Sequence, residues 1–436
     1  MSENDQQTPS RRDFLKASGA VAAGAVVAPL VLPSRSDAES AAPEIRIGLI
    51  GCGGRGTGAA FQALNADPGV VLVAMGDVFK SQIENSLNAL KGDAKVANRV
   101  RVSPEMQFVG LDCYKKVIDS GVDVVLLASP PGFRWREIRA AVEAGKHLFA
   151  EKPCATDAAG VRSVLESAKI ADQKKLSFVA GFCWRYEPGR REFYRRIHSG
   201  AIGDVRAVHA TYLAGPVKPM PPASERPAGI SDVEWQIRNW YNFVWLSGDG
   251  LVEQACHSVD KILWAFGDKP PARCTANGGR VNPNNEGNIF DHIDVFYEWD
   301  NGLRATISQR QIAGAYSENS DYVIGAKGVG YIRGWEAPEL HSSTVWKYDG
   351  PKKDMYQVEH DELFASIRSG KHINNGERMA ISTLAAIMGR MAAYTGQQLT
   401  WEQAMNSQWN LFPDPLTWDM PLQIPPMAVP GKTPFL

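Results

Sequence analysis

Three closely spaced glycines constrain the fold of this chain more than any other feature. The segment EIRIGLIGCGGRGTGAAFQAL (44–64) has a short β-type run, then the pattern G-x-G-x-x-G, then a helical pattern. The first glycine permits a tight turn, the second lets the backbone approach a pyrophosphate, and the third allows close packing of helix on strand. Free N–H groups at the start of the helix would then face the phosphates. This order predicts a dinucleotide site whose loop comprises Gly51, Gly53, Gly54, Arg55 and Gly56.

An acidic residue, Asp77, stands at the end of the next β-type run, VVLVAMGD (70–77). In dinucleotide sites such a carboxylate accepts hydrogen bonds from the ribose hydroxyls. Asp77 therefore favours NAD over NADP, because its charge repels a 2′-phosphate. Lys80, close behind it, keeps NADP as the alternative cofactor.

Two further β-type runs lead into polar residues. The apolar run VDVVLLASP (122–130) is typical of a buried parallel strand, and the strand expected at 146–150 leads into Glu-Lys-Pro. Ligands of open α/β sheets bind at the carboxyl ends of the strands. The cofactor-binding residues expected here are Ser129, Pro130, Glu151 and Lys152.

Lys152 is also a candidate for chemistry. A lysine beside an apolar ring and a positively charged cofactor can have a lowered pKa, and it could then bind or deprotonate an alcohol. The alternative interpretation is a lysine on a surface turn.

The segment GDGLVEQACHSVDKILWAFG (248–267) is predicted to form a helix with one apolar face. At about 100° per residue, Glu253, His257 and Asp260 fall in one narrow strip on the other face. Such a strip is either a solvated surface or an acid/base group that faces a cleft. Glu253 and His257 could also form half of a metal site, but the sequence offers no convincing third ligand, so we expect no metal.

The glycine loop, the run ASPPGFRWREIRAAVEAGKHLFAEKP and the helix that carries His257 resemble the glucose–fructose oxidoreductase/inositol dehydrogenase/MocA family. The resemblance covers nearly all of the chain after its N-terminal segment. It implies an NAD(P)-dependent oxidoreductase in which Lys152 lies at the reacting carbon and His257 exchanges the hydroxyl proton of the substrate. The acidic position falls on Glu253, where the family commonly has Asp. Arg134 stands where many relatives have His.

The resemblance favours a strip that faces the cofactor cleft, with Lys152, His257 and Glu253 as the catalytic candidates. Aromatic side chains beside a hydride site suit the C–H surface of a sugar ring, and they equally suit a hydrophobic lid packed on the core. The substrate-binding candidates are Arg185, Trp240, Trp245 and Asp260.

The second half of the chain has the pattern of an α+β domain. A strand is expected at 204–213 after a helix at 189–199, and Asn301-Gly302 is typical of a hairpin between two strands. The expected fold class is an α/β Rossmann domain at 44–186, followed at 187–436 by an α+β domain with a large, mainly antiparallel sheet. In relatives such a sheet commonly mediates subunit contacts, so we expect a homo-oligomer. The Pro-rich C-terminal tail is expected to wrap the surface or a neighbouring subunit.

The amino-acid composition limits the classes of partner that the protein is expected to bind. The 436 residues are 44% hydrophobic and 22% charged, with a net charge of −1. This balance lacks the basic surface that nucleic acid or an anionic membrane would require, so we expect neither as a partner. Six scattered cysteines, without C-x-x-C or metal spacing, are interpreted as small core residues.

The N-terminal segment carries a targeting pattern. Arg11 and Arg12 precede Phe-Leu-Lys and an apolar run of small residues at 17–32. Paired arginines before a run too short to span a membrane indicate a bacterial twin-arginine signal. We expect residues 1–43 to be signal and linker, and the twin-arginine machinery to carry the folded protein to the periplasm. No cysteine follows the run directly, so we expect a soluble product without a stable membrane anchor.

Export constrains the chemistry, because NAD is not expected to be supplied outside the cytoplasm. We therefore expect the cofactor to be loaded before transport and retained. The leading hypothesis is an NAD-dependent oxidoreductase that acts on a hydroxyl of a sugar or glycoside. The alternatives are an NAD-dependent glycoside hydrolase or lyase that works by transient oxidation, and a non-catalytic protein that binds nucleotide or sugar.

Replacement of both arginines by lysine, Arg11→Lys with Arg12→Lys, should leave the protein in the cytoplasm, because the paired guanidinium groups define the signal. Immunoblots of periplasmic and cytoplasmic fractions measure the outcome. An unchanged periplasmic yield would contradict the export signal.

Overall fold

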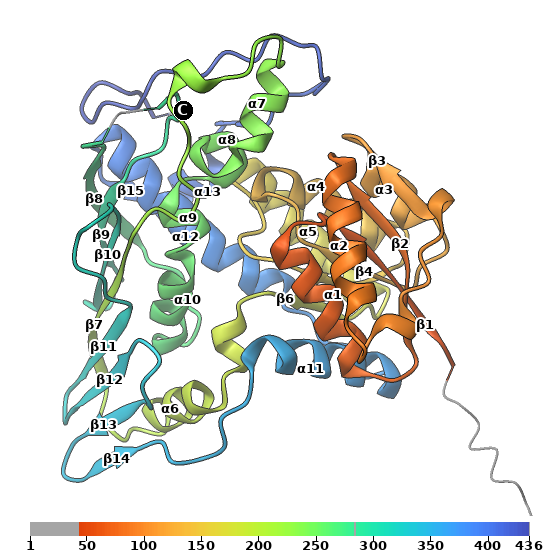
Figure 1. Ribbon diagram of the computed structural model, residues 1–436. Helices are drawn as coiled ribbons and strands as arrows, with labels where there is room; N and C mark the ends of the chain where they lie inside the picture. The colour runs from red at the N-terminus through yellow and green to blue at the C-terminus, as the bar shows by residue number, and fades with distance from the viewer. Residues whose placement is uncertain (1–42, 283–284, 436) are drawn as a thin grey trace, which may run out of the picture. The chain divides into compact units, whose positions relative to one another are not determined.

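The computed structural model describes residues 43–282 and 285–435, so the predicted signal segment lies outside the described residues except for Pro43. The described residues form one compact unit that contains two β-sheets (Figure 1). The expected domain boundary at residues 186 and 187 stays a prediction.

The first sheet confirms the predicted Rossmann architecture. Its strands are all parallel in the order β3-β2-β1-β4-β5-β6. They are β1 (Ile45–Ile50), β2 (Val70–Asp77), β3 (Gln107–Val109), β4 (Val124–Leu127), β5 (His147–Ala150) and β6 (Phe178–Ala180). The central strands are apolar and buried on both faces, as a parallel sheet covered by helices requires.

Helices cover both faces of this sheet (Figure 1). One face packs against α1 (Gly54–Ala66), α2 (Lys80–Gly92) and α11 (Met355–Ser369). The other face packs against α3 (Cys113–Asp119), α4 (Pro131–Glu143) and α5 (Ala158–Gln173). Since α11 comes from far along the chain and contacts α1, the C-terminal half helps to complete the first sheet's layers.

The second sheet has the order β14-β13-β12-β11-β7-β10-β9-β8-β15 and is mainly antiparallel, as predicted, with β7 and β10 as its parallel pair. Its strands are β7 (Val205–Ala214), β8 (Arg273–Gly279), β9 (His292–Glu298), β10 (Arg304–Gln311), β11 (Ser320–Gly325), β12 (Val329–Arg333), β13 (Glu339–His341), β14 (Val345–Lys347) and β15 (Leu399–Thr400). The predicted hairpin is confirmed between β9 and β10, where Gly302 has a φ of +85°.

A buried helix joins the two sheet systems. α12 (Gly376–Thr395) is buried along most of its length and contacts both α5 and β8 (Figure 1). The other helices are α6 (Pro188–His198), α7 (Asp232–Arg238), α8 (Val244–Ser247), α9 (Gly250–Glu253), α10 (Cys256–Ala265) and α13 (Trp401–Asn406), with 3₁₀ turns at η3 (Cys183–Tyr186) and η5 (Trp240–Asn242) among the shorter elements.

The helix predicted at 248–267 is interrupted. Gln254 and Ala255 both donate their N–H to the carbonyl of Gly250, at 3.0 and 3.1 Å, and this shift in hydrogen bonding separates α9 from α10. The polar positions are as buried as the apolar ones: Asp260 is 1% exposed and His257 is 9% exposed. The strip is therefore not a solvated helix face.

Two further predictions concern packing. All six cysteines are buried free thiols, which confirms their interpretation as core residues. The Pro-rich tail folds onto its own chain: Phe412, Leu416 and Trp418 join a hydrophobic cluster with residues of α7 and α8. This cluster also reaches Phe79, just beyond the end of β2, so the tail supports one wall of the site described next.

Candidate active site

A cavity of about 1000 Å³ lies at the carboxyl ends of β1, β2, β4 and β5. The first sheet contributes residues that directly end or follow these strands, among them Asp77, Ser129 and Glu151. The opposite wall comes from β7, α9 and α10 and includes Glu253 and His257. The cavity occupies the place where open α/β sheets bind their ligands.

The glycine loop fits a dinucleotide. A Cβ on Gly51, whose φ is +85°, would lie 2.5 Å from the N atom of Ser129, and a Cβ on Gly56 would lie 1.8 Å from the carbonyl oxygen of Gly51. Side chains at Gly53 and Gly54 would meet no described atom within 4 Å, and both glycines line the cavity. The loop thus holds open a backbone-walled space at the N-terminus of α1, as a bound pyrophosphate requires.

Asp77 lies in the cavity wall at the end of β2. Its carboxylate accepts hydrogen bonds from the N–H groups of Cys52, at 2.7 Å, and Phe79, at 2.9 Å. Burial raises the pKa of Asp77, although these hydrogen bonds oppose the shift. Lys80 points to solvent beside Glu84, and the cavity-lining residues of the described chain do not include it. The arrangement suits a ribose that carries two free hydroxyls.

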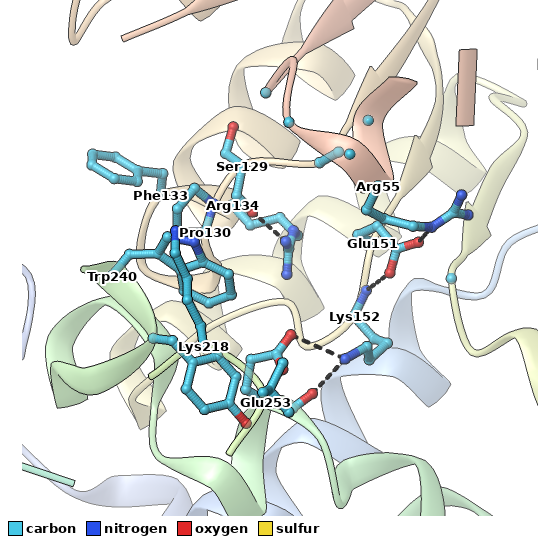
Figure 2. A pocket seen from close by; sticks show the side chains of 18 of the residues that line it. Arg55, Ser129, Pro130, Phe133, Arg134, Glu151, Lys152, Lys218, Trp240 and Glu253 are labelled. Atoms are coloured by element: carbon cyan, nitrogen blue, oxygen red, sulfur yellow. Dashed lines mark hydrogen bonds and ion pairs between the residues drawn. The ribbon is translucent and has the colours of Figure 1, made fainter. Parts of the chain in front are cut away.

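Arg55 connects the glycine loop to the Glu-Lys-Pro turn. Its guanidinium forms an ion pair with Glu151 (Figure 2). It forms a second ion pair, at 3.0 Å, with Glu359 of α11. Glu151 in turn accepts a hydrogen bond from the N–H of Lys152 at 3.1 Å. Sequence reasoning missed Glu359, because it lies 304 residues from Arg55 and no local pattern marks it.

Lys152 is buried and faces Glu253 (Figure 2). Its Nζ lies 3.1 Å from Oε1 of Glu253 and also donates to the carbonyl oxygen of that residue. Burial lowers the pKa of Lys152, but attraction to the Glu253 carboxylate, together with smaller contributions from Cys256, Glu151 and Tyr212, outweighs burial, so the pKa is raised. Lys152 is therefore a cationic hydrogen-bond donor to Glu253, and the lower pKa expected beside a positively charged cofactor stays a prediction.

His257 has the opposite electrostatic character. Burial lowers its pKa well below the usual value, and the positive charges of Lys152, Lys261 and Arg55 add to this effect. The rings of His257 and Phe182 are nearly perpendicular at a centroid distance of 5.9 Å, and Nδ1 has no hydrogen-bond partner within the described residues. His257 is thus a neutral imidazole that can accept a proton in the cavity.

Three of the four predicted substrate-binding residues lie outside the cavity wall. Asp260 is held in the core by Arg185, with Nε to Oδ2 at 2.7 Å, and by the hydroxyl of Ser382 at 2.7 Å. Trp245 donates to the side chain of Gln236 and packs in the hydrophobic cluster of the tail. The strip therefore divides: Glu253 and His257 face the cavity, whereas the Asp260 carboxylate turns to the buried cation that neutralises it.

The fourth of these residues, Trp240, does line the cavity.

Two lining residues on α4, Glu137 and Arg134, were not predicted as site residues. Glu137 accepts a hydrogen bond from the hydroxyl of Ser129 at 2.6 Å, and burial raises the pKa of Glu137 to about 7. Arg134, noted above only as a departure from the family pattern, is buried and donates to the carbonyls of Ser129 and Pro153 (Figure 2). The helical spacing of Arg134 and Glu137 on α4 is the sequence signal that could have placed both side chains beside Ser129.

The described residues offer neither a metal site nor a membrane-spanning helix. In the ranges 43–282 and 285–435, no group of three or more His, Cys, Asp or Glu side chains has an arrangement that could hold a metal ion. Within the same ranges, no helix has both the length and the apolar character needed to cross a membrane.

Comparison with known proteins agrees with this architecture. The model of an oxidoreductase family with an NAD-binding Rossmann fold matches residues 45–179, and the model of the GFO/IDH/MocA C-terminal domain matches residues 191–330. The chain belongs to the GFO/IDH/MocA family. It is therefore an NAD-dependent oxidoreductase, as the family resemblance implied. The twin-arginine signal is also confirmed, since a model of that signal matches residues 8–28.

Relatives within the GFO/IDH/MocA family share the fold at low identity. Inositol 2-dehydrogenase of Rhizobium meliloti is 22% identical over 78% of this chain and 94% of its own length. Inositol 2-dehydrogenase 4 of Saccharopolyspora erythraea is 31% identical over 39% of this chain and 45% of its own length. The crystal structure of aldose-aldose oxidoreductase from Caulobacter crescentus, complexed with glycerol, has a TM-score of 0.65 at 17% identity and covers 82% of this chain and 99% of that one.

Asp77→Asn should weaken the binding of NAD while it strengthens the binding of NADP, because the amide no longer repels a 2′-phosphate. A loss of about tenfold to a hundredfold in NAD affinity corresponds to the usual range for a hydrogen bond to a charged group. Isothermal titration of cofactor-stripped protein measures both affinities, with Lys80→Ala as the control that should change neither. Equal changes for NAD and NADP would remove Asp77 from the ribose site.

Proposed function

We propose that this protein oxidises a hydroxyl of a sugar or glycoside in the periplasm with a retained NAD. The observation that carries the proposal is the juxtaposition of cationic Lys152 and neutral His257 in the cavity of the glycine loop. The names of the relatives, two inositol dehydrogenases and an aldose-aldose oxidoreductase, support a polyhydroxylated substrate.

The residues divide the chemistry between them. NAD, when bound, supplies a hydride acceptor for the C–H bond of the carbinol carbon. The Lys152 ammonium donates a hydrogen bond to the substrate oxygen and stabilises negative charge that develops there as the alcohol loses its proton. His257 accepts that proton, since its imidazole is neutral. Glu253 acts on Lys152, whose charge it maintains and whose Nζ it holds in place.

The cavity offers further groups to a polyol. The hydroxyl of Tyr212 on β7 donates to Gln254 at 2.7 Å, and both residues line the cavity beside His257. Trp240 adds an apolar ring surface to the wall. Hydroxyl and amide groups next to aromatic rings match the alternating polar edges and apolar faces of a sugar.

The packing around Asp77 supports retention of the cofactor. Phe79 contacts Trp418 of the tail at a centroid distance of 6.1 Å, and the guanidinium of Arg238 in α7 lies 4.2 Å from the Phe79 ring. The wall at the ribose end is thus built from elements that are distant in the sequence. We infer that this packed wall slows the release of a cofactor loaded before export. The homo-oligomer stays a prediction of the family resemblance.

The proposal is tested by denaturing the purified protein, identifying the released nucleotide by mass spectrometry, and then adding sugars and glycosides to the intact protein. We expect NAD in near-stoichiometric amount, an absorbance increase at about 340 nm, and a product with an oxidised carbon. Cleavage of a glycoside without a lasting absorbance change would indicate a hydrolase or lyase that works by transient oxidation. Bound nucleotide without any turnover would indicate a binding protein.

His257→Ala should leave NAD bound but slow substrate oxidation by a factor on the order of 10²–10⁴, because the proton acceptor is lost. Lys152→Ala should be comparably severe, and the double variant less severe than the product of the two effects, since the two groups act as a unit. Single-turnover absorbance measures the rate, and His341→Gln on β13, outside the cavity-lining residues, is the control. Full activity of His257→Ala would contradict the mechanism.

Glu253→Gln should lower the pKa of Lys152, because the carboxylate is the main charge that raises it. The oxidation rate requires the ammonium form, so its decline at alkaline pH should move to lower pH. Rate profiles between about pH 6 and 11 detect the shift across the usual lysine range. Glu44→Gln, which removes an exposed carboxylate paired with Arg101, serves as the control. An unmoved alkaline limb would show that Glu253 does not tune Lys152.

A further inference from the structure

An exposed tryptophan stands at the rim of the cavity. Trp335 follows β12 in the connection to β13, and 75% of its surface is exposed. It nevertheless lines the same cavity as His257, Gln254 and Tyr212. An exposed indole at the rim of a cavity offers an apolar face on which a ligand in that cavity can pack.

The backbone that carries Trp335 is fixed. The carbonyl oxygen of Gly334 accepts a hydrogen bond from Nη2 of the buried Arg190 in α6 at 2.7 Å, and the N–H of Gly334 donates to the carbonyl of Asn319 at 2.7 Å. On the other side of the ring, the N–H of Glu336 donates to the carbonyl of Arg333 at 2.9 Å. These bonds tie the β12–β13 connection to α6, which lies beside it (Figure 1). The ring is therefore presented by a well-supported turn.

A second tryptophan supports the first. The rings of Trp335 and Trp184 are 4.8 Å apart at an interplanar angle of 46°. Trp184, in η3, is itself covered by the Arg190 guanidinium at 3.8 Å from its ring, and it also lines the cavity. Trp335 thus rests on a buried aromatic and cationic stack, and the exposed remainder of its ring is available to a ligand. Asn319 places an amide side chain among the lining residues of the same region.

We propose that Trp335, Trp184 and Asn319 form a subsite for a second sugar ring, so that the substrate is a glycoside or disaccharide and not a single sugar. This rests on the proposed function, in which the first ring lies between Lys152 and His257. The apolar C–H face of a pyranose would pack on the Trp335 ring, and its hydroxyls would meet the Asn319 amide at the edge. The rigid turn lowers the entropic cost of binding, since no loop has to become ordered.

The test compares ligands that share one sugar but differ in the second ring. Methyl β-glucoside, methyl β-galactoside and methyl β-mannoside are paired with cellobiose, lactose and β-mannobiose, and each is titrated calorimetrically into the NAD-bound protein. For the recognised sugar, the disaccharide should bind about tenfold more tightly than the methyl glycoside, as expected for one ring stacked on an aromatic side chain. Trp335→Ala should abolish this advantage and leave the affinity for the methyl glycoside unchanged.

The control is Tyr316→Ala, which removes an aromatic ring that is 72% exposed and is not among the described cavity-lining residues. Equal affinity of the native protein for both members of a pair would overturn the subsite, as would an equal loss for both in Trp335→Ala. A Trp335→Ala change in sedimentation mass without a change in sugar binding would assign the ring to a subunit contact instead. If the methyl glycosides still bind and are oxidised, the proposed function stands although the subsite is overturned. If no methyl glycoside or disaccharide binds or is oxidised, both the proposed function and the subsite are overturned.

Discussion

The site depends on one buried ion pair, Lys152 with Glu253, which joins the turn after β5 to the end of α9. Withdrawing two charges from water is costly, and their mutual attraction offsets that cost only when the geometry is good and the remaining polar atoms are satisfied. Here the lysine has two oxygen partners on one residue. Removing one member of such a pair typically costs about 3–5 kcal/mol, so this contact also fastens the two halves of the cavity together.

The same ion pair helps to set the pKa values of Lys152 and His257 in opposite directions. The carboxylate keeps Lys152 cationic, and the resulting positive charge helps to keep His257 neutral. A donor and an acceptor of protons thus stand side by side without competing for one proton, which is the general requirement for acid and base groups in one site. The longer side chain of Glu253, relative to the Asp common in the family, reaches the lysine with its carboxylate 3.1 Å from Nζ.

The sequence was sufficient where local pattern decides the outcome. The glycine loop, Asp77 and the Glu-Lys-Pro turn occupy positions that strand and turn geometry impose, and the hairpin at Gly302 follows from its backbone conformation. The sequence was insufficient where a partner far away along the chain determines where a side chain lies. Asp260 shares the helical strip of His257, but Arg185 and Ser382 draw its carboxylate into the core. Arg55 likewise pairs with Glu359 as well as with Glu151, and only the folded chain brings Glu359 near.

The burial of all six free thiols matters for a protein that carries an export signal. Burial raises the pKa of Cys154 and Cys256 to about 12, so their reactive thiolate forms are scarce at neutral pH. An oxidising compartment scrambles chains that arrive unfolded with free cysteines, since thiol–disulfide exchange proceeds through the thiolate. A chain that crosses the membrane already folded keeps every one of these sulfur atoms out of reach. Folded export, which the twin-arginine signal indicates, would therefore allow these cysteines to remain reduced packing residues in an oxidising compartment.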